Sequence, residues 1–325
     1  MRIRGVIEGF YGPPWSHEER QDLLAFCGRH GFNTWVHAPK DDPFHRERWR
    51  DPYPDEELER FGELVVAAER HGVEFVWAVA PGLSIRAGEE SDLDALDAKR
   101  EQLRGAGVRS FQLLWDDIEP DAVAAEAQAE ISNRFAGGEP LVVCPMSYTG
   151  SARTPYRDAF GSRLDPQIVV YWTGPEVVSE SISREQLEAA ADALGHELIL
   201  WDNYPVNDFD PGRLFLGPLR GRDPRLAEGR LGGILANGML QAVPSKLALA
   251  TVADYSRDPL AYDPLGSFER ALREHAAEVV EALRRLAPKP AEVRPPADLA
   301  ALAEALAPGV DAASAIALLE PFAGD

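Results

Sequence analysis

The sequence predicts an α/β fold, a closed (β/α)8 barrel (TIM barrel) followed by a C-terminal helical extension. Two observations lead to this prediction. Eight short apolar runs recur along the chain of 325 residues, and segments with helix signals lie between many of them. Neighbouring runs begin roughly 30 residues apart, which suits one strand and one helix with loops and is too long for hairpins. Eight such units in a chain of this length favour a closed barrel.

The eight runs are continuous rather than alternating in hydrophobicity, as expected for strands that are covered on both faces. An open doubly wound sheet is the alternative, but no Gly-x-Gly-x-x-Gly turn follows the first run. We therefore expect the closed barrel. The runs are GVIEGF from Gly5, TWVHAPK from Thr34, EFVWAVAPG from Glu74, SFQLLWDD from Ser110, LVVCPMSY from Leu141, QIVVYWTG from Gln167, ELILWDN from Glu197 and GGILAN from Gly232.

Capping patterns predict the starts of three helices. A Ser followed three residues later by an acid or an amide can satisfy two backbone N–H groups at a helix N-terminus. Gly31 is expected to end the first of these helices. The three pairs are Ser16 with Glu19, Ser91 with Asp94, and Ser183 with Gln186.

The segment 55–72 has helical periodicity. Leu58, Phe61, Leu64, Val65 and Ala68 fall on one face of a helix there. The segments after the fifth and seventh runs are rich in Pro, Gly and Arg instead. We expect long loops with short helices in those two places.

The composition changes from about Gly266 onward, where Ala-rich helical segments surround a Pro-rich break, PKPAEVRPP. We expect the barrel to span residues 1–257 and the helical extension to span residues 258–325. An extra helical layer packed on the barrel is favoured over a module that binds a partner.

The overall composition limits the possible partners. A net charge of −21 argues against binding to nucleic acid or to an anionic membrane, because both need a basic surface. The two cysteines, Cys27 and Cys144, have neither metal-ligand spacing nor the pattern of a disulfide framework. No signal peptide and no run of about 18 apolar residues occurs, so a soluble cytoplasmic protein is expected. The oligomeric state is left open.

Polar and aromatic residues follow the expected strands, where a barrel enzyme builds its active site. Acids and amides offer hydrogen bonds to sugar hydroxyls, and Trp or Tyr rings stack on the C–H faces of a sugar. We therefore expect a carbohydrate site. The residues at the strand ends are Gly9, Phe10 and Tyr11; Lys40, Asp41 and Asp42; Asp116 and Asp117; Tyr148; Trp172, Thr173 and Gly174; Trp201, Asp202 and Asn203; and Asn237, with Asn207 and Asp208 in the loop after the seventh strand.

We expect neither a metal nor a cofactor at this site. No phosphate-binding glycine loop occurs in the sequence. A metal at Asp116 and Asp117 would need further ligands, and the strand ends offer no histidine cluster. His37 and His45 are the nearest candidates.

Asp116 and Asp117 are adjacent at the end of an apolar strand, and this adjacency bears on the reaction. The usual glycosidase pair flanks the scissile bond from opposite sides, which two sequence neighbours cannot easily do. A 2-acetamido sugar supplies its own nucleophile, because its carbonyl oxygen attacks the anomeric carbon and forms an oxazoline. One Asp then polarises the acetamido N–H while the other protonates the leaving oxygen. Two successive inversions predict retention of configuration.

Six long motifs lie in order between about Arg4 and Tyr255: GVIEGFYGPPWS, APKDDPFHRERWR, WAVAPG, LLWDDI, YWTGPEVVS and LWDNYPVNDF. Together they resemble glycoside hydrolase family 84. That family contains the protein O-GlcNAcases and bacterial β-N-acetylglucosaminidases, some of them named hyaluronidases. The resemblance implies a retaining hydrolase that removes terminal β-linked N-acetylglucosamine from a glycoside or glycoprotein.

The resemblance also implies roles for individual residues. Asp116 would orient the acetamido group, and Asp117 would act as general acid and then as general base. Tyr148 would hydrogen-bond the acetamido oxygen, and Asn203 would support the catalytic pair. The remaining contacts would come from Cys144 and Trp201 around the acetamido methyl group and from the Gly9 carbonyl, Lys40, Asp208 and Asn237 at the sugar hydroxyls.

Some features depart from the family's pattern. Gly238 stands where Pro often follows the last strand's Asn, and His37 stands where an aromatic residue often precedes APKDD. The barrel begins without the α/β domain that precedes it in many bacterial relatives, and the helical tail matches nothing in the pattern. These departures bear on the accepted aglycones more than on the chemistry.

Two rival functions remain open. The first is a non-catalytic sugar-binding barrel, which has no need of adjacent acids. The second is a hydrolase of N-acetylgalactosamine or hyaluronan-type linkages. Turnover of a fluorogenic N-acetylglucosaminide tests the first rival, and a comparison of gluco and galacto substrates tests the second.

Overall fold

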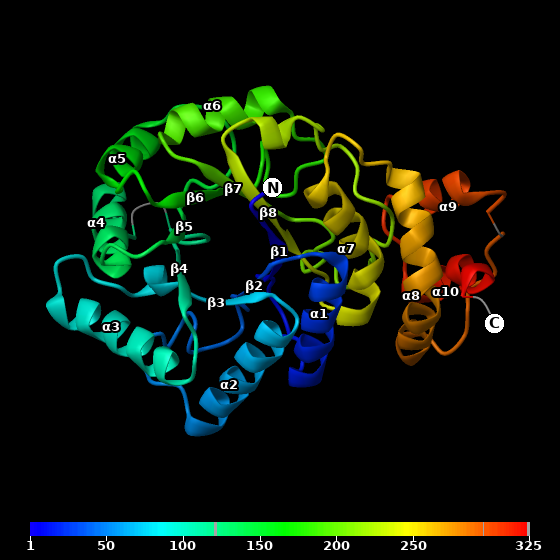
Figure 1. The fold of residues 1–325 in the computed structure, drawn as a ribbon, viewed down its shortest axis with the longest axis horizontal. Coiled ribbons are helices and arrows are strands. Elements are labelled where there is room, and N and C mark those ends of the chain that lie inside the picture. The colour runs from blue at the N-terminus through cyan, green and yellow to red at the C-terminus, as the bar shows by residue number, and fades with distance from the viewer. Residues whose placement is uncertain (120–121, 295, 324–325) are drawn as a thin grey trace.

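Eight parallel strands close into a barrel in chain order, with β8 paired to β1 (Figure 1). This computed structural model describes residues 1–119, 122–294 and 296–323. All eight expected strands are present, and the closed barrel is confirmed. The strands are β1 (Ile3–Glu8), β2 (Thr34–His37), β3 (Glu74–Val79), β4 (Ser110–Leu114), β5 (Val142–Cys144), β6 (Val169–Trp172), β7 (Leu198–Asp202) and β8 (Leu231–Asn237).

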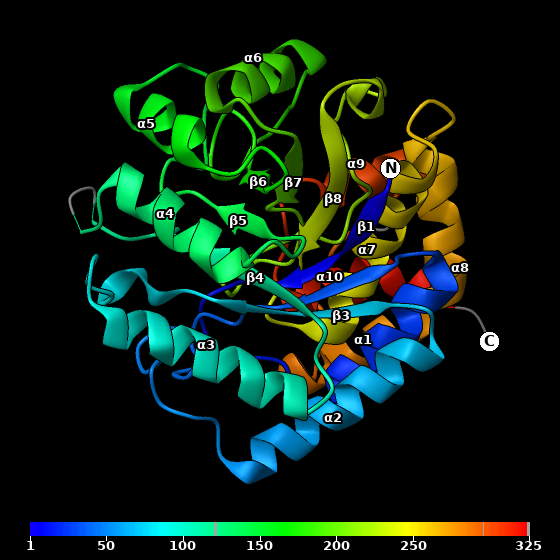
Figure 2. The same cartoon turned by 60° about the vertical axis from the view of Figure 1, so that its left-hand side comes forward.

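Helices alternate with the strands and cover the outside of the barrel (Figures 1 and 2). The helix after β5 has only nine residues, and the connection after β7 carries the short 3-10 helix η2 (Leu226–Glu228). Both agree with the expected long loops. The barrel helices are α1 (His17–His30), α2 (Asp55–Arg70), α3 (Glu90–Gly105), α4 (Ala125–Ala136), α5 (Pro155–Arg163), α6 (Arg184–Leu194) and α7 (Ala242–Arg257), and η1 (Pro81–Leu83) follows β3.

Two of the three predicted caps are confirmed. Ser16 and Ser183 each form a full capping box at the start of α1 and α6, and Gly31 ends α1 with a left-handed φ of 78°. The cap at Ser91 is wrong, because α3 already begins at Glu90. Asp92 organises that helix start instead: its carboxylate accepts hydrogen bonds from the Arg86 backbone and from the Arg50 side chain.

The apolar face predicted for segment 55–72 packs against the barrel as α2. Phe61, Leu64, Val65 and Ala68 are buried, and Leu58 is half-buried. The helical period thus placed the buried stripe correctly, since only one side of a barrel helix faces the sheet.

The barrel interior is a packed core rather than a channel. Apolar side chains from alternate positions fill it, and the hydroxyl of Tyr171 donates to Gln112 Oε1 at 2.7 Å. This filling leaves no open passage through the barrel, and the C-terminal mouth is where barrel enzymes place their active site. Trp201 and Cys144 form the uppermost part of this core, where it borders the mouth.

Three further helices follow the barrel: α8 (Pro264–Leu286), α9 (Leu299–Leu306) and α10 (Ala312–Leu319), with the 3-10 helix η3 (Glu320–Phe322) after them. Figure 1 shows α8 against the outer side of α7, with α9 and α10 beyond it. The predicted extension is therefore helical and packs on the barrel. Its expected span, 258–325, includes residues 295 and 324–325, which lie outside the described residues.

No helix among the described residues combines the length and the hydrophobicity that a membrane crossing requires.

Candidate active site

A cavity of about 210 Å³ opens at the C-terminal ends of the strands. All ten residues that were expected to act on or bind the sugar line it, although they come from six different strand ends or the loops that follow them. The ten are Gly9, Lys40, Asp116, Asp117, Cys144, Tyr148, Trp201, Asn203, Asp208 and Asn237.

Asp116 lies on the floor of this cavity, just beyond β4. It is buried, and its Oδ2 lies 2.5 Å from the ammonium nitrogen of Lys40, which is also buried. Its other oxygen, Oδ1, has no hydrogen-bond partner among the described residues. A buried carboxylate oxygen without a donor is costly in a folded protein. It is therefore an acceptor suited to a donor that a ligand brings.

Asp117 differs from its neighbour in exposure and in backbone conformation. Asp117 is exposed. Among the residues that the structure describes, it is the only one other than glycine with a positive φ, which is 54°. Such a conformation is uncommon for an aspartate and turns the side chain away from the strand direction. A hydrogen bond from Arg46 Nη2 to the Asp117 carbonyl, at 2.9 Å, holds the peptide in place. Strained backbone of this kind concentrates at functional sites.

Two phenols hold the Asp117 carboxylate. The hydroxyl of Tyr148 donates to Oδ1 at 2.7 Å, and the hydroxyl of Tyr11 donates to Oδ2 at 2.9 Å. Burial, followed by the contact with Asp117, raises the pKa of both tyrosines above its ordinary value. Both phenols therefore keep their protons at neutral pH and act as donors.

The loops around the mouth are joined by amide side chains. Asn237 accepts from the Gly9 backbone N–H at 3.2 Å and donates to Asn203 Oδ1 at 3.0 Å. Asn203 in turn donates to the Val177 carbonyl at 2.7 Å. This chain connects the ends of β1, β8 and β7 with the loop after β6. Asp208 adds a fourth connection by accepting from the Tyr11 backbone N–H at 2.9 Å.

Trp201 forms one wall of the cavity. Its ring packs edge-on against Tyr171 at 5.3 Å, and Lys40 Nζ lies 5.3 Å from its centre. The ring needs Gly9 opposite it, because a Cβ there would lie only 2.4 Å from Trp201 Cζ2. Cys144 completes this side, and burial raises the pKa of its thiol well above the usual value. A thiol in this state is a packing group and not a nucleophile.

Tyr11 and Thr173, which were named at the strand ends without a role as contacts, also line the cavity. Four apolar lining residues were not named at all: Val177, Val178, Val206 and Phe209. The exposed valines and Phe209 form an apolar rim. Periodicity cannot find such residues, since an apolar side chain in a loop looks the same whether it packs inward or borders a cavity. A large aromatic residue just after the acids and amides of NYPVNDF was the available signal.

Other polar residues at the strand ends do not line the cavity. Asp202 forms a buried ion pair with Arg222 at 2.6 Å, and Asp42 accepts from the Tyr53 hydroxyl at 2.7 Å. His45 Nδ1 lies 2.7 Å from the Ala78 carbonyl, and His37 lies beside Asp42. These groups brace the barrel behind the cavity wall.

Comparison with known proteins gives a consistent result. Residues 4–288 match the family model described as beta-N-acetylglucosaminidase, and this match runs through α8. The chain is 38% identical over 270 residues to the protein O-GlcNAcase of Rattus norvegicus, covering 77% of this chain and 29% of that protein.

Two solved structures are similar throughout the barrel. One is an aspartate-to-asparagine mutant of the Thermobaculum terrenum O-GlcNAc hydrolase, with a TM-score of 0.81 and 35% identity over 87% of this chain and 65% of that chain. The other is CpGH84B, with a TM-score of 0.80 and 33% identity over 93% of this chain and 60% of that chain. The chain thus spans less than a third of the curated relative and less than two thirds of each structural relative.

Proposed function

We propose, for a chain that belongs to the β-N-acetylglucosaminidases of glycoside hydrolase family 84, that it removes terminal β-linked N-acetylglucosamine with retention of configuration. The reaction would proceed through an oxazoline formed by the substrate's own acetamido group. The main support is the contrast between the two adjacent acids. Asp116 is buried with one oxygen unpartnered among the described residues, and Asp117 is exposed at the mouth of the same cavity.

In the first step, Asp116 Oδ1 would accept the acetamido N–H. The acetamido oxygen then attacks the anomeric carbon, and the bond to the leaving oxygen breaks. The positive charge that develops on the amide lies beside the Asp116 carboxylate, which stabilises it electrostatically. Lys40 holds the other carboxylate oxygen and so fixes the orientation of Oδ1.

Asp117 would supply the proton that the leaving oxygen needs and recover a proton in the second step. That proton comes from the water that attacks the anomeric carbon and reopens the oxazoline. The positive φ of Asp117 supports this role, since it separates the two neighbouring carboxyl groups into different parts of the cavity. Tyr148, which donates to Asp117 here, would turn its hydroxyl to the acetamido oxygen when substrate binds.

The remaining residues would position the sugar. The Gly9 carbonyl, Lys40, Asp208 and Asn237 would contact its hydroxyls, and Asn203 would hold Asn237 in place. Trp201 and Cys144 would enclose the acetamido methyl group, because both border the cavity with apolar surface beside Asp116. The apolar rim of Val177, Val178 and Phe209 would face the aglycone, which suits a glycoprotein or an oligosaccharide.

A fluorogenic aryl β-N-acetylglucosaminide tests this proposal directly. We expect hydrolysis of this substrate, no cleavage of the corresponding plain glucoside, and a β-configured product in early-time NMR. Asp41→Asn is a matched control for acid-to-amide changes at Asp116 and Asp117, because exposed Asp41 neighbours Lys40 without lining the cavity. Rapid cleavage of the glucoside, or an inverted product, would contradict the proposal. The galacto epimer tests whether Asp208 and Asn237 read the 4-hydroxyl.

A further inference from the structure

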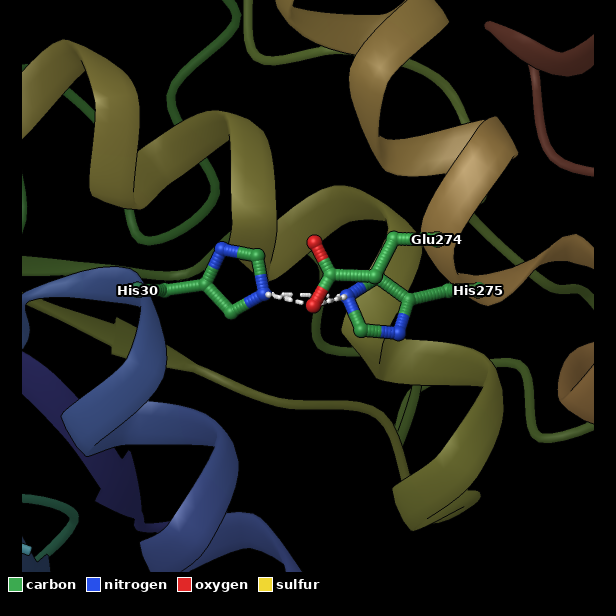
Figure 3. A group of neighbouring side chains, drawn as sticks. All are labelled: His30, Glu274 and His275. Atoms are coloured by element: carbon green, nitrogen blue, oxygen red, sulfur yellow. Dashed lines mark hydrogen bonds and ion pairs between the residues drawn. The ribbon is translucent and has the colours of Figure 1, made fainter.

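A second group of chemically competent side chains lies away from the sugar cavity, where the C-terminal extension meets the barrel. His30 ends α1, and Glu274 and His275 project from α8 toward it (Figure 3). The Nε2 atoms of the two histidines are 3.0 Å apart, and Glu274 Oε1 lies 3.4 Å from His30 Nε2 and 3.6 Å from His275 Nε2. We propose that these three residues bind a first-row divalent cation, with Zn²⁺ as the preferred ion.

The spacing of the three atoms fits tetrahedral coordination. Zn–N and Zn–O bonds of 2.0–2.1 Å at tetrahedral angles place neighbouring ligand atoms about 3.3 Å apart. The three separations here, 3.0, 3.4 and 3.6 Å, bracket that value. Shifts of a few tenths of an ångström would therefore admit the ion. Two imidazoles and one carboxylate form a ligand set that zinc sites commonly use.

The environment of His275 orients its ring as a metal-bound histidine is usually oriented. Its Nδ1 lies 2.6 Å from Glu278 Oε1, and Glu278 Oε2 accepts from Lys246 Nζ at 2.6 Å. A carboxylate on one ring nitrogen fixes the tautomer and leaves a lone pair on the other. That other nitrogen is Nε2, and it points at His30 and Glu274 (Figure 3).

Packing also restrains the two rings. Phe26 lies one helical turn before His30, with its ring 4.3 Å from the His30 ring and 5.3 Å from the His275 ring. The His275 side chain is only 2% exposed, and that of His30 is 13% exposed. Preorganised ligands of this kind lose little conformational entropy on binding.

Without a cation, the same atoms can form a simple hydrogen bond in which His30 donates to His275 Nε2. A cation needs the His30 proton on Nδ1 instead. Glu274, whose side chain is 49% exposed, provides the negative charge and an open side on which water can complete the coordination shell.

The cation would connect the barrel to the helical extension. Its ligands come from α1 and α8, and the two histidines are 245 residues apart in the chain. An ion that binds only the folded state adds stability in proportion to the logarithm of its concentration over its Kd. We therefore assign the site a structural role, in which it fixes α8 against the barrel.

The test uses the full chain, stripped of metal with a chelator and titrated with ZnCl₂ in a calorimeter and in thermal melts. We expect one equivalent to bind saturably and to raise Tm, while MgCl₂ has no effect. His30→Gln and His275→Gln should each weaken binding by about tenfold or more, as changes at zinc sites typically do. His71→Gln, at the C-terminal end of α2, is the matched control and should bind as the parent does.

Glu274→Gln separates a metal site from a structural histidine pair, because this side chain is half exposed and its loss should leave the Tm of the metal-free protein unchanged. It should nevertheless weaken Zn²⁺ binding and alter the visible spectrum of a Co²⁺-substituted sample. Lack of saturable binding would overturn the proposal. Binding that survives both histidine substitutions unchanged would overturn it equally.

Discussion

Lys40 Nζ lies 2.5 Å from Asp116 Oδ2, and both side chains are almost fully buried, with 1% and 7% exposure. This ion pair joins the segments that follow β2 and β4 at the floor of the cavity. Removing one partner of a buried pair leaves an uncompensated charge, which costs more than the pair itself contributes. The pair therefore holds Asp116 in position. Substitution of either partner alone should destabilise the folded protein.

Lys40→Met should lower the free energy of unfolding by about 3–5 kcal/mol, because Asp116 is then buried without its counter-charge. Adding Asp116→Asn to Lys40→Met should recover part of that loss, since the charge is gone. Urea denaturation of both single variants and the double variant measures the coupling. Additive losses in the double variant would mean that the two groups do not interact energetically.

Asp117→Asn should reduce kcat/KM by about 10²- to 10⁴-fold for substrates with poor leaving groups, the usual size of general acid catalysis. Aryl glycosides of acidic phenols should suffer far less in the first step, because their leaving oxygen needs no proton. The measurement is a leaving-group series on parent and variant. Equal losses across the series would exclude Asp117 as the acid.

Gly9→Ala should abolish most activity, because the added methyl group would lie 2.4 Å from Trp201 Cζ2 and displace the wall of the cavity. Gly62→Ala, inside α2, is the control: its Cβ would meet nothing closer than 3.5 Å. The control should keep full activity and gain about 0.5–1 kcal/mol of stability. Steady-state kinetics and thermal melts of both variants decide this. A fully active Gly9→Ala enzyme would show that the wall can move freely.

His45 should make the protein less stable in acid. Burial lowers its pKa from 6.5 to about 3. Below pH 6.5 the unfolded chain therefore binds a proton at this residue that the folded chain does not. The contribution of neutral His45 is complete above pH 6.5 and is lost toward pH 3, at about 1.4 kcal/mol per pH unit.

His45→Asn removes this titration and keeps a donor for the Ala78 carbonyl, which His45 Nδ1 contacts at 2.7 Å. The unfolding free energies of parent and variant, measured in urea between pH 7 and pH 4, should converge as the pH falls. Parallel curves would show that His45 does not carry the acid sensitivity.

Local sequence signals predicted most of the elements and placed polar residues at the strand ends, and the resemblance to glycoside hydrolase family 84 selected the ten residues that line the cavity. Continuous apolar runs are typical of strands covered on both faces, and helical stripes such as Phe61 and Leu64 follow from burial on one side. The local signal failed at Ser91, where Asp92 and its arginine contacts determine the helix start. The capping pattern from Ser91 to Asp94 extends over only four residues, and the contacts of Asp92 with arginines outside the helix outweigh it.

The sequence by itself determined the order of strands and helices and the pair of adjacent acids, because both depend on residues close together in the chain. Only the tertiary structure decided how those acids differ. Lys40 reaches Asp116 across 76 residues, and Tyr11 reaches Asp117 across 106. Closure of the barrel brings such distant groups together, and no local period encodes which of them meet. The pairing of His30 with His275 has the same origin, since it arises only when α8 packs along α7 and brings His275 to the end of α1.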